Sequence, residues 1–292
     1  IQVNDARVNI DDTGEDDDIG YLVELDDNAS DDVIQISNGD TFEIKSNFKT
    51  ESQKNYITNY LSQSYEAILT KNKQIVDQFI DIPSAVDAYI IEELFKNPDV
   101  GWGSFYFTKP KGDRLYFGPV WDFDISAGNS DDDTGIIWNF DLSAGNPMDD
   151  EGNVTIKSYK YTYVGNKSIM MIQQNLWFVA LRECDWFNEL VKIRWNELRS
   201  HAKKTVEHIG EVANKYEKSF QRNFNRWYIF DQKINLEPDE IMQIKSFTGQ
   251  VEYLQNWLNN RIEWLTEYYE GRENDYAPPS KVGSYSPGIV RG

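Results

Sequence analysis

Residues 97–129 read NPDVGWGSFYFTKPKGDRLYFGPVWDFDISAGN, and this stretch decides the fold prediction. Two aromatic and β-branched runs, residues 104–109 and 114–120, flank the residues Pro-Lys-Gly-Asp, a composition typical of a turn. The pattern therefore predicts a β-hairpin. Because a hairpin brings its two ends together, we expect Asp99, ahead of the first strand, and Asp122, after the second, to point into one cleft.

The second strand leads into a pair of aspartates. If the strand continues through residue 124, Asp122 and Asp124 share one face of it, and Trp121 and Phe123 occupy the other. Carboxylates of this kind suit Mg²⁺ or Mn²⁺, which proteins hold with one or two carboxylates and substrate phosphates. We therefore predict a metal site at Asp122 and Asp124, with Trp121 and Phe123 packed behind it. For Asp124, a role as a hydrogen-bond acceptor in a loop is an equal alternative.

The order of these features matches phosphoryl transfer in protein kinases. There, a loop aspartate accepts the proton of the substrate hydroxyl, two strands follow, and a second aspartate before Phe holds the metal on the phosphates. Asp99 and Asp122 correspond to these two roles. The kinase catalytic loop has Asn five residues after its aspartate as a ligand of a second metal, but position 104 is Ser. Ser104 is therefore a weaker candidate ligand, and its simpler interpretation is a residue at the start of a strand.

The composition excludes other classes of function. The 292 residues include 29 Lys and Arg against 49 Asp and Glu, and the formal net charge of −20 repels nucleic acids and anionic membranes. Cys184 is the single cysteine, which excludes an intrachain disulfide and a Cys-based zinc site. His201 and His208 are roughly 10 Å apart along a helix, too far to bind one metal. No apolar run is long enough for a membrane span. If the protein is an enzyme, Asp and Glu carboxylates must therefore act as its general acids and bases.

The remaining sequence indicates a β-rich beginning and a helical remainder, and so an α+β fold. Alternating residues predict strands at the edge of a small β lobe, with solvated acidic loops between them, over residues 1–10, 21–25 and 41–45. Apolar spacings of three and four predict helices over residues 51–78, 85–97, 169–182, 186–220 and 238–270. Ser84, with Asp87, resembles the cap of the second helix. Residues 130–160, rich in Asp, Gly and Asn, predict a long irregular insertion.

Residues 97–129 also resemble a known family, the CotH kinases, which are spore-coat-type secreted protein kinases. The resemblance rests on Asp99, on the aromatic run after Ser104, and on the segment Gly-Pro-Val-Trp-Asp-Phe-Asp that ends at Asp124 and is followed by Gly128 and Asn129. Later residues resemble a helical segment of the family: Leu176, Trp177, Phe178, Phe187, Arg194, Glu197 and Leu198. The similarity extends over roughly residues 1–270.

The resemblance implies an atypical two-lobed kinase-like fold, Mg²⁺-dependent use of ATP, and phosphorylation of protein Ser or Thr. Asp99 and Asp122 would be the two essential carboxylates. Since the family's ATP-gripping strands would precede Ile1, we expect a truncated small β lobe in a kinase-like domain of residues 1–276. Residues 277–292, rich in Pro, Ser and Gly, are expected to link it to a further module. The expected localisation is extracellular, at a bacterial cell surface or spore.

Two other classes of function remain open. A non-catalytic, pseudokinase-like scaffold within a larger secreted assembly fits the same features. A carbohydrate-binding module would use exposed Trp, but most of the nine Trp lie in helical segments, as with Trp186 and Trp195, or beside the aspartate pair, where packing explains them. Asn129, which follows Gly128, is typical of a turn and is a weak site candidate.

Overall fold

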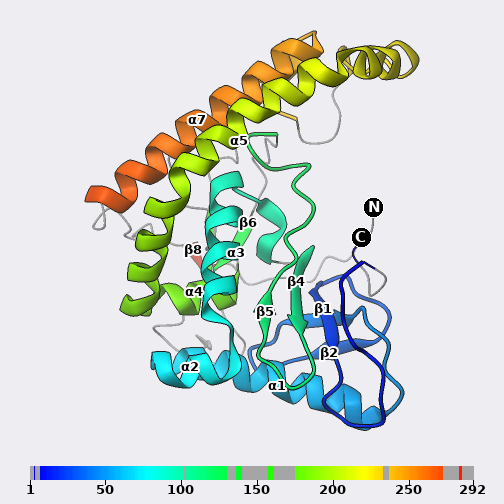
Figure 1. Cartoon of the computed structure of the whole chain (residues 1–292), viewed down its shortest axis with the longest axis vertical. Helices are drawn as coiled ribbons and strands as arrows, with labels where there is room; N and C mark the ends of the chain where they lie inside the picture. Colours follow the sequence, from blue (N-terminus) through cyan, green and yellow to red (C-terminus); the bar gives the residue numbers. More distant parts are fainter. Residues whose placement is uncertain are drawn as a thin grey trace. The chain divides into compact units, whose positions relative to one another are not determined.

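The computed structural model describes residues 3, 7–101, 103–129, 136–139, 157–160, 175–232, 237–271 and 283–284 (Figure 1). The chain forms two compact units. The first comprises Ile1–Glu93, Pro98–Phe123 and Asn175–Arg194, and the second comprises Leu94–Asn97, Asp124–Gln174 and Trp195–Gly292. A small antiparallel sheet near the N-terminus precedes a mainly helical region, which confirms the α+β prediction.

The first unit is built on a five-stranded antiparallel sheet of order β2-β3-β1-β4-β5. Its strands are β1 (Tyr21–Leu25), β2 (Val33–Gln35), β3 (Thr41–Ile44), β4 (Phe105–Lys109) and β5 (Tyr116–Phe117). The predicted hairpin is confirmed. The prediction that β1 lies at the edge of the sheet is wrong. β1 lies between β3 and β4, and β4 comes much later in the sequence. The described residues 7–10 form a turn rather than the predicted strand.

One face of the hairpin forms the main aromatic core of the first unit. Phe105 and Phe107 of β4 and Phe117 of β5 are buried there against α4 (Leu176–Arg182). The ring centroid of Phe107 lies 4.7 Å from that of Phe117 and 4.8 Å from that of Trp177. Such aromatic contacts stabilise the fold beyond the burial of apolar area alone. The core therefore fixes the register of the hairpin.

The opposite face of the hairpin packs against Val3, Val8 and Ile10, which lie near the beginning of the chain. Tyr106 is buried there with Val3 and Leu22, and Trp121 packs partly against this cluster. Trp121 therefore packs against apolar side chains, as predicted, and Phe123 is half-buried. Their position behind a metal site stays a prediction. Because Tyr106 lies between two buried phenylalanines in the sequence, strand alternation accounts for its position on the opposite face.

Helices α1 (Glu51–Leu69), α2 (Lys73–Phe79) and α3 (Ile82–Phe95) belong largely to the first unit. The predicted helix over residues 51–78 is split at Lys71, whose φ of 57° ends α1. Helix α3 begins earlier than predicted, since Asp81 Oδ1 accepts the Ser84 amide at 2.9 Å and acts as the cap. The predicted capping partner, Asp87, instead binds Arg194 at 2.7 Å.

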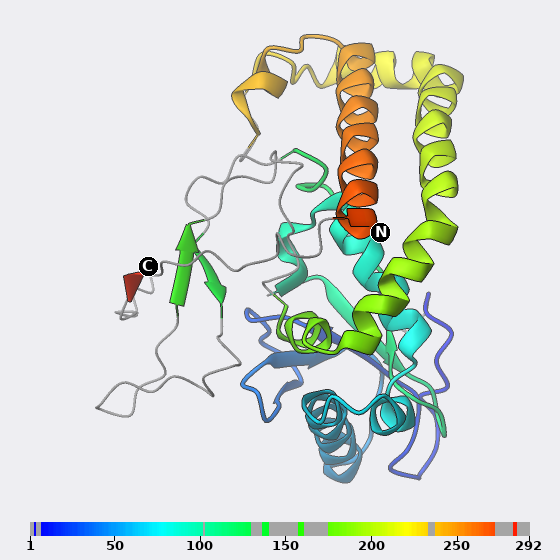
Figure 2. The same ribbon diagram turned by 90° about the vertical axis from the view of Figure 1, so that its left-hand side faces the viewer.

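The second unit contains most of α5 (Asp185–Arg226), with α6 (Asp239–Met242) and α7 (Phe247–Gly271). Figure 2 shows α5 and α7 side by side, and they are joined by a 3.2 Å bond from Trp195 to Thr266 and by stacking of Phe220 on Phe247. None of the described helices is long and apolar enough to cross a membrane.

A three-stranded sheet also lies in the second unit, with strands β6 (Ile136–Asn139), β7 (Lys157–Lys160) and β8 (Gly283–Ser284). Two of these strands fall within residues 130–160, which were predicted to be irregular. The rest of that predicted insertion and most of the predicted linker, residues 277–292, lie outside the described residues.

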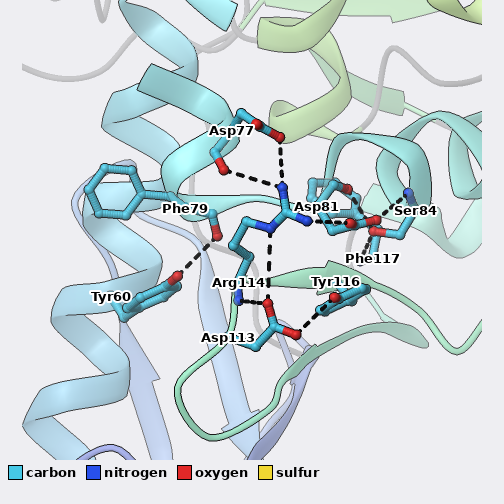
Figure 3. A network of polar contacts seen from close by, with 9 residues as sticks. All are labelled: Tyr60, Asp77, Phe79, Asp81, Ser84, Asp113, Arg114, Tyr116 and Phe117. Carbon is cyan, nitrogen blue, oxygen red and sulfur yellow. Dashed lines mark hydrogen bonds and ion pairs between the residues drawn. The ribbon is translucent and has the colours of Figure 1, made fainter. Parts of the chain in front are cut away.

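An ion-pair network fixes the hairpin to the helices of the first unit (Figure 3). Arg114, at the end of the hairpin turn, donates to Asp77 Oδ1 at 2.7 Å and to Asp81 Oδ2 at 3.0 Å. Asp77 lies on α2 and Asp81 caps α3. The Ser84 hydroxyl accepts the Phe117 amide at 3.1 Å. The second strand is thereby attached to the beginning of α3.

We expect Arg114→Gln to lower the free energy of unfolding by about 1 to 2 kcal/mol. The substitution removes the cation beside Asp81, whose side chain is only 14 % exposed. Thermal unfolding measures the loss. Lys111→Gln on the same hairpin breaks a more exposed pair with Asp16 and is the matched control, with an expected change below about 0.5 kcal/mol. Equal losses in the two variants would contradict the role of Arg114.

A desolvated carboxylate lies beside α4 in the same unit. Asp40 Oδ2 accepts bonds from Trp177 Nε1 at 3.0 Å and from Asn38 Nδ2 at 2.8 Å. Burial raises the pKa of Asp40 to about 6, although these bonds act to lower it. The folded protein therefore binds this proton more tightly than the unfolded chain does. Protonation of Asp40 therefore contributes to the free energy of unfolding. This contribution is fully present below the unfolded pKa of 3.8 and is lost as the pH rises through the folded pKa of about 6.

Asp40→Asn should remove this pH dependence, because one amide oxygen can accept both bonds without carrying a charge. We expect the variant to exceed the original chain in stability at pH 8, by up to about 3 kcal/mol, and to show little gain near pH 4. Denaturant unfolding at the two pH values tests this. Asp31→Asn changes an exposed aspartate of the same region and serves as the control. A gain of equal size at both pH values would show the titration to be unimportant.

Candidate functional site

Asp99 lies in a short 3₁₀ turn, Pro98–Gly101, of the first unit. Its carbonyl accepts the Gly103 amide at 3.0 Å, and the carbonyl of the buried Val100 accepts Asn175 Nδ2 at 2.7 Å. Asn175 is itself buried and caps α4, since its Oδ1 accepts the amide of Trp177 at 3.0 Å. The half-buried Asp99 is therefore held in place through α4.

Asn175 is a positioning residue that the sequence interpretation missed. Its local signal is an Asn directly before the apolar run Leu-Trp-Phe, which is typical of a helix N-cap. The second bond, from its amide to Val100, joins segments that lie far apart in the sequence. No local pattern could have predicted that bond.

Ser104 and Asp122 meet at the open end of the hairpin, within the first unit. The Ser104 hydroxyl donates to Asp122 Oδ2 at 3.3 Å. Ser104 directly precedes β4, and Asp122 follows β5 after a short irregular segment. The two ends of the hairpin therefore meet at Ser104 and Asp122. That Asp99 and Asp122 point into one cleft stays a prediction. Asp122 is exposed, as a metal ligand or substrate-binding group must be.

The predicted continuation of the second strand through residue 124 is wrong. The last bond to β4 is that from the Gly118 amide to the Tyr106 carbonyl, at 2.8 Å. Gly118 then takes a φ of 123°, Pro119 has no amide hydrogen to donate, and Asp122 takes a φ of 61°. Asp122 and Asp124 therefore do not share one face of a strand.

Asp124 opens a loop of the second unit that closes on itself. Asn129 Nδ2 donates to the Asp124 carbonyl at 2.7 Å, and the Asn129 amide donates to the Ser126 carbonyl at 3.0 Å. Gly128 has a φ of 82°, and a Cβ added there would lie 2.5 Å from Trp257 Cδ1. Gly128 and Asn129 thus shape the loop. The side chain of Asp124 is exposed, and its role as a metal ligand stays a prediction.

Tyr106 lies in the middle of β4, and its pKa is affected by the charge of Asp122. Burial raises the pKa of Tyr106 above its usual range, and the carboxylates of Glu24, Glu43 and Asp122 raise it further. The phenol is therefore protonated at neutral pH. Sequence reasoning assigned no role to Tyr106, because the aromatic run Phe-Tyr-Phe indicates only a buried strand.

The donor set at Asp122 suits a hard divalent cation. Carboxylate and hydroxyl oxygens are the ligands that Mg²⁺ and Mn²⁺ prefer. Asp122 is an exposed carboxylate, and Ser104 is a hydroxyl that orients it. The arrangement can hold a cation and leave its other positions to water or phosphate oxygens.

Comparison with known proteins gives the family of the chain. The family model described as CotH kinase protein matches residues 3–265. No curated protein matches the chain. The matched range includes Asp99, Ser104, Asp122 and Asp124, and it covers most of the sequence. The chain is therefore kinase-like and belongs to the CotH kinase protein family.

Proposed function

We propose that this chain is a protein Ser/Thr kinase that uses ATP with Mg²⁺ or Mn²⁺. The observation that carries the proposal is the bond between Ser104 and Asp122, which orients an exposed carboxylate at the open end of the hairpin. Membership of the CotH kinase protein family supports the same reaction class. We also propose that the protein is bacterial and works outside the cell, at its surface or on the spore, as the family resemblance suggests.

In the proposed reaction, Asp99 orients the hydroxyl of a Ser or Thr on a protein substrate and accepts its proton. The hydroxyl oxygen attacks the γ-phosphorus of ATP, the bond to the bridging oxygen breaks, and ADP leaves with that oxygen. Asp122, with Asp124 as a second proposed ligand, would hold the divalent metal. When bound, the metal neutralises charge on the phosphates. Asn175 keeps the turn of Asp99 in place through Val100.

A non-catalytic scaffold is the second candidate function. The specific observation in its favour is Ser104, which stands where the kinase catalytic loop has the Asn that binds a second metal. Its hydroxyl donates to Asp122. A scaffold of this type would bind nucleotide and transfer no phosphate, so binding and transfer must be measured separately.

Asp122→Ala should weaken Mg·ATP binding on the order of 10²-fold, because a metal ion on phosphates contributes several kcal/mol. The fold should persist, since Asp122 is exposed. Calorimetric titration gives the affinity, and thermal unfolding checks the fold. Asp31→Ala, another exposed aspartate of the first unit, is the control. Unchanged affinity in Asp122→Ala would rule out the metal assignment.

Asp99→Asn should slow phosphoryl transfer by on the order of 10² to 10⁴, the usual contribution of a positioned general base. Affinity for Mg·ATP should change little, because Asp99 is not proposed to bind the metal. Transfer of labelled γ-phosphate to protein under single-turnover conditions measures the step. Near-normal transfer with weakened ATP binding would show that the two aspartates have been assigned the wrong roles. Binding without transfer in the unsubstituted chain would favour the scaffold.

A further inference from the structure

The end of α5 carries a row of cations on one face. Lys215, Lys218, Arg222 and Arg226 follow one another at spacings of three and four residues, and all four are exposed. On a helix of about 3.6 residues per turn they fall within roughly a quarter of the circumference and extend over roughly 16 Å. We call these four residues the basic stripe. The whole stripe belongs to the second unit.

Apolar side chains are exposed at the same end of the helix. Trp227 and Tyr228, which follow the last residue of α5, are 60 % and 52 % exposed, and Ile229 is exposed as well. We call these three residues the apolar tip. Figures 1 and 2 show this end of α5, in yellow, at the same end of the helical pair as the beginning of α7, in orange. Large apolar side chains that gather in water mark an interaction surface.

Aromatic packing holds the apolar tip in place. The ring centroid of Phe220 lies 4.3 Å from that of Phe247 of α7, and that of Phe224 lies 4.6 Å from that of Phe230, which follows the tip. Lys245 Nζ donates to the Phe230 carbonyl at 2.8 Å. Because Phe220 and Phe224 lie on the side of α5 opposite the basic stripe, the stripe faces away from α7. The exposed side chains are therefore carried by an ordered structure.

The stability of the helix does not account for the basic stripe. Like charges four residues apart repel each other on a helix, and Lys218, Arg222 and Arg226 form two such pairs. Residues 215–226 contain one carboxylate, that of Glu217, against the four cations of the stripe. In a chain of net charge −20, this end of α5 therefore has the opposite sign. The charge of the stripe is complementary to an anionic partner.

A sugar is the less suitable partner for the exposed aromatic residues. Sugars stack on the open face of an aromatic ring. Arg226 lies over the Trp227 ring, 5.0 Å from its centroid, and Lys215 lies over the Tyr216 ring, 5.2 Å from its centroid. Ile229 offers no ring at all. The side chains of the apolar tip therefore fit an apolar environment better than a sugar.

An anionic phospholipid surface fits the stripe and the tip together. Trp and Tyr are enriched at membrane–water interfaces, and Lys and Arg near a bilayer attract anionic headgroups. Headgroups move within the plane of the bilayer and can gather beside four cations of any spacing, whereas a protein partner needs carboxylates at matching positions. The net charge of the chain repels such a surface. However, the Debye length is about 8 Å at physiological salt, so the cations nearest the surface outweigh carboxylates farther away.

We propose that the basic stripe and the apolar tip dock the protein on an anionic phospholipid bilayer, with the cations against the headgroups and the tip inserted among them. The side chains of Trp227, Tyr228 and Ile229 leave water on docking, and the headgroups take the place of counterions around the stripe. The contact is peripheral and needs no membrane-spanning segment. It does not depend on the proposed kinase reaction.

Sedimentation of the 292-residue chain with vesicles tests the proposal. Vesicles of phosphatidylcholine and phosphatidylglycerol should bind the chain much more tightly than vesicles of phosphatidylcholine alone, and added salt should weaken the binding. Arg222→Gln/Arg226→Gln should weaken it about 10- to 30-fold, since each cation near an anionic surface contributes to binding. Lys203→Gln/Lys204→Gln removes two exposed cations of the same helix outside the basic stripe. This matched control should lose less than about threefold.

A second set of variants tests the apolar tip. Trp227→Ser/Ile229→Ser should weaken binding to the anionic vesicles about tenfold or more, because less apolar surface leaves water. Ile193→Ser changes another exposed Ile of α5 and is the control, with no change expected. Circular dichroism checks that each variant is folded, as expected for substitutions of exposed residues.

Three outcomes would overturn the proposal. They are no binding to the anionic vesicles, equal binding to both kinds of vesicle, and equal losses in the stripe variant and its control. Analytical ultracentrifugation without lipid gives the oligomeric state. Self-association that Arg222→Gln/Arg226→Gln abolishes, without binding to vesicles, would assign this surface to a second copy of the chain instead. Each of these outcomes leaves the proposed function standing.

Discussion

The pairing of β4 with β1 is the interaction on which the candidate site depends. It runs from Tyr21 opposite Lys109 to Leu25 opposite Phe105, and it joins the hairpin to the strands near the N-terminus. A slip of one residue would turn Tyr106 into the aromatic core and expose its neighbours, so burial on the two faces fixes the register strongly. Within the hairpin, the pairing of β4 with β5, which sets Phe107 opposite Phe117, brings Asp122 to Ser104.

Two aspartates of the loop before β1 form ion pairs with lysines of the hairpin. Asp18 Oδ1 lies 2.7 Å from the Nζ of Lys109, whose side chain is 1 % exposed, and Asp18 Oδ2 accepts the Gly112 amide at 3.0 Å. Asp16 pairs with Lys111 at 2.9 Å. The loop is exposed at Asp16, as expected, and Asp18 attaches it to the hairpin turn. Since a buried charge without its partner is strongly destabilising, the acidic loop and the hairpin depend on each other for stability.

The sequence predicted those features whose signals are local. The turn residues gave the hairpin, and the spacing of apolar residues gave α1, whose Ile57, Leu61 and Tyr65 are buried as expected. The central place of β1 was missed because its pairing with β4 is non-local. A strand through Asp124 was predicted from the alternation of residue types alone. The positive φ angles of Gly118 and Asp122 end the strand before it reaches Asp124. The contact of Asn175 with Val100 was missed because it joins distant segments. The hairpin was expected to bring Asp99 to Asp122, and the bond of Ser104 to Asp122 was not predicted.

The backbone at the open end of the hairpin is not optimised for stability. Ser104 and Asp122 both have positive φ, 54° and 61°, and such residues cost about 1 to 3 kcal/mol each unless their surroundings hold them. Phe105 and Trp121 are their neighbours in the sequence. Both pack against apolar side chains, and this packing holds Ser104 and Asp122 in their conformations. Gly would relieve the strain at position 122 and Asn would tolerate it as well as Asp does. Backbone geometry therefore does not require a carboxylate at position 122. The metal site that we propose there would require one, because an exposed and oriented carboxylate is what a divalent metal needs.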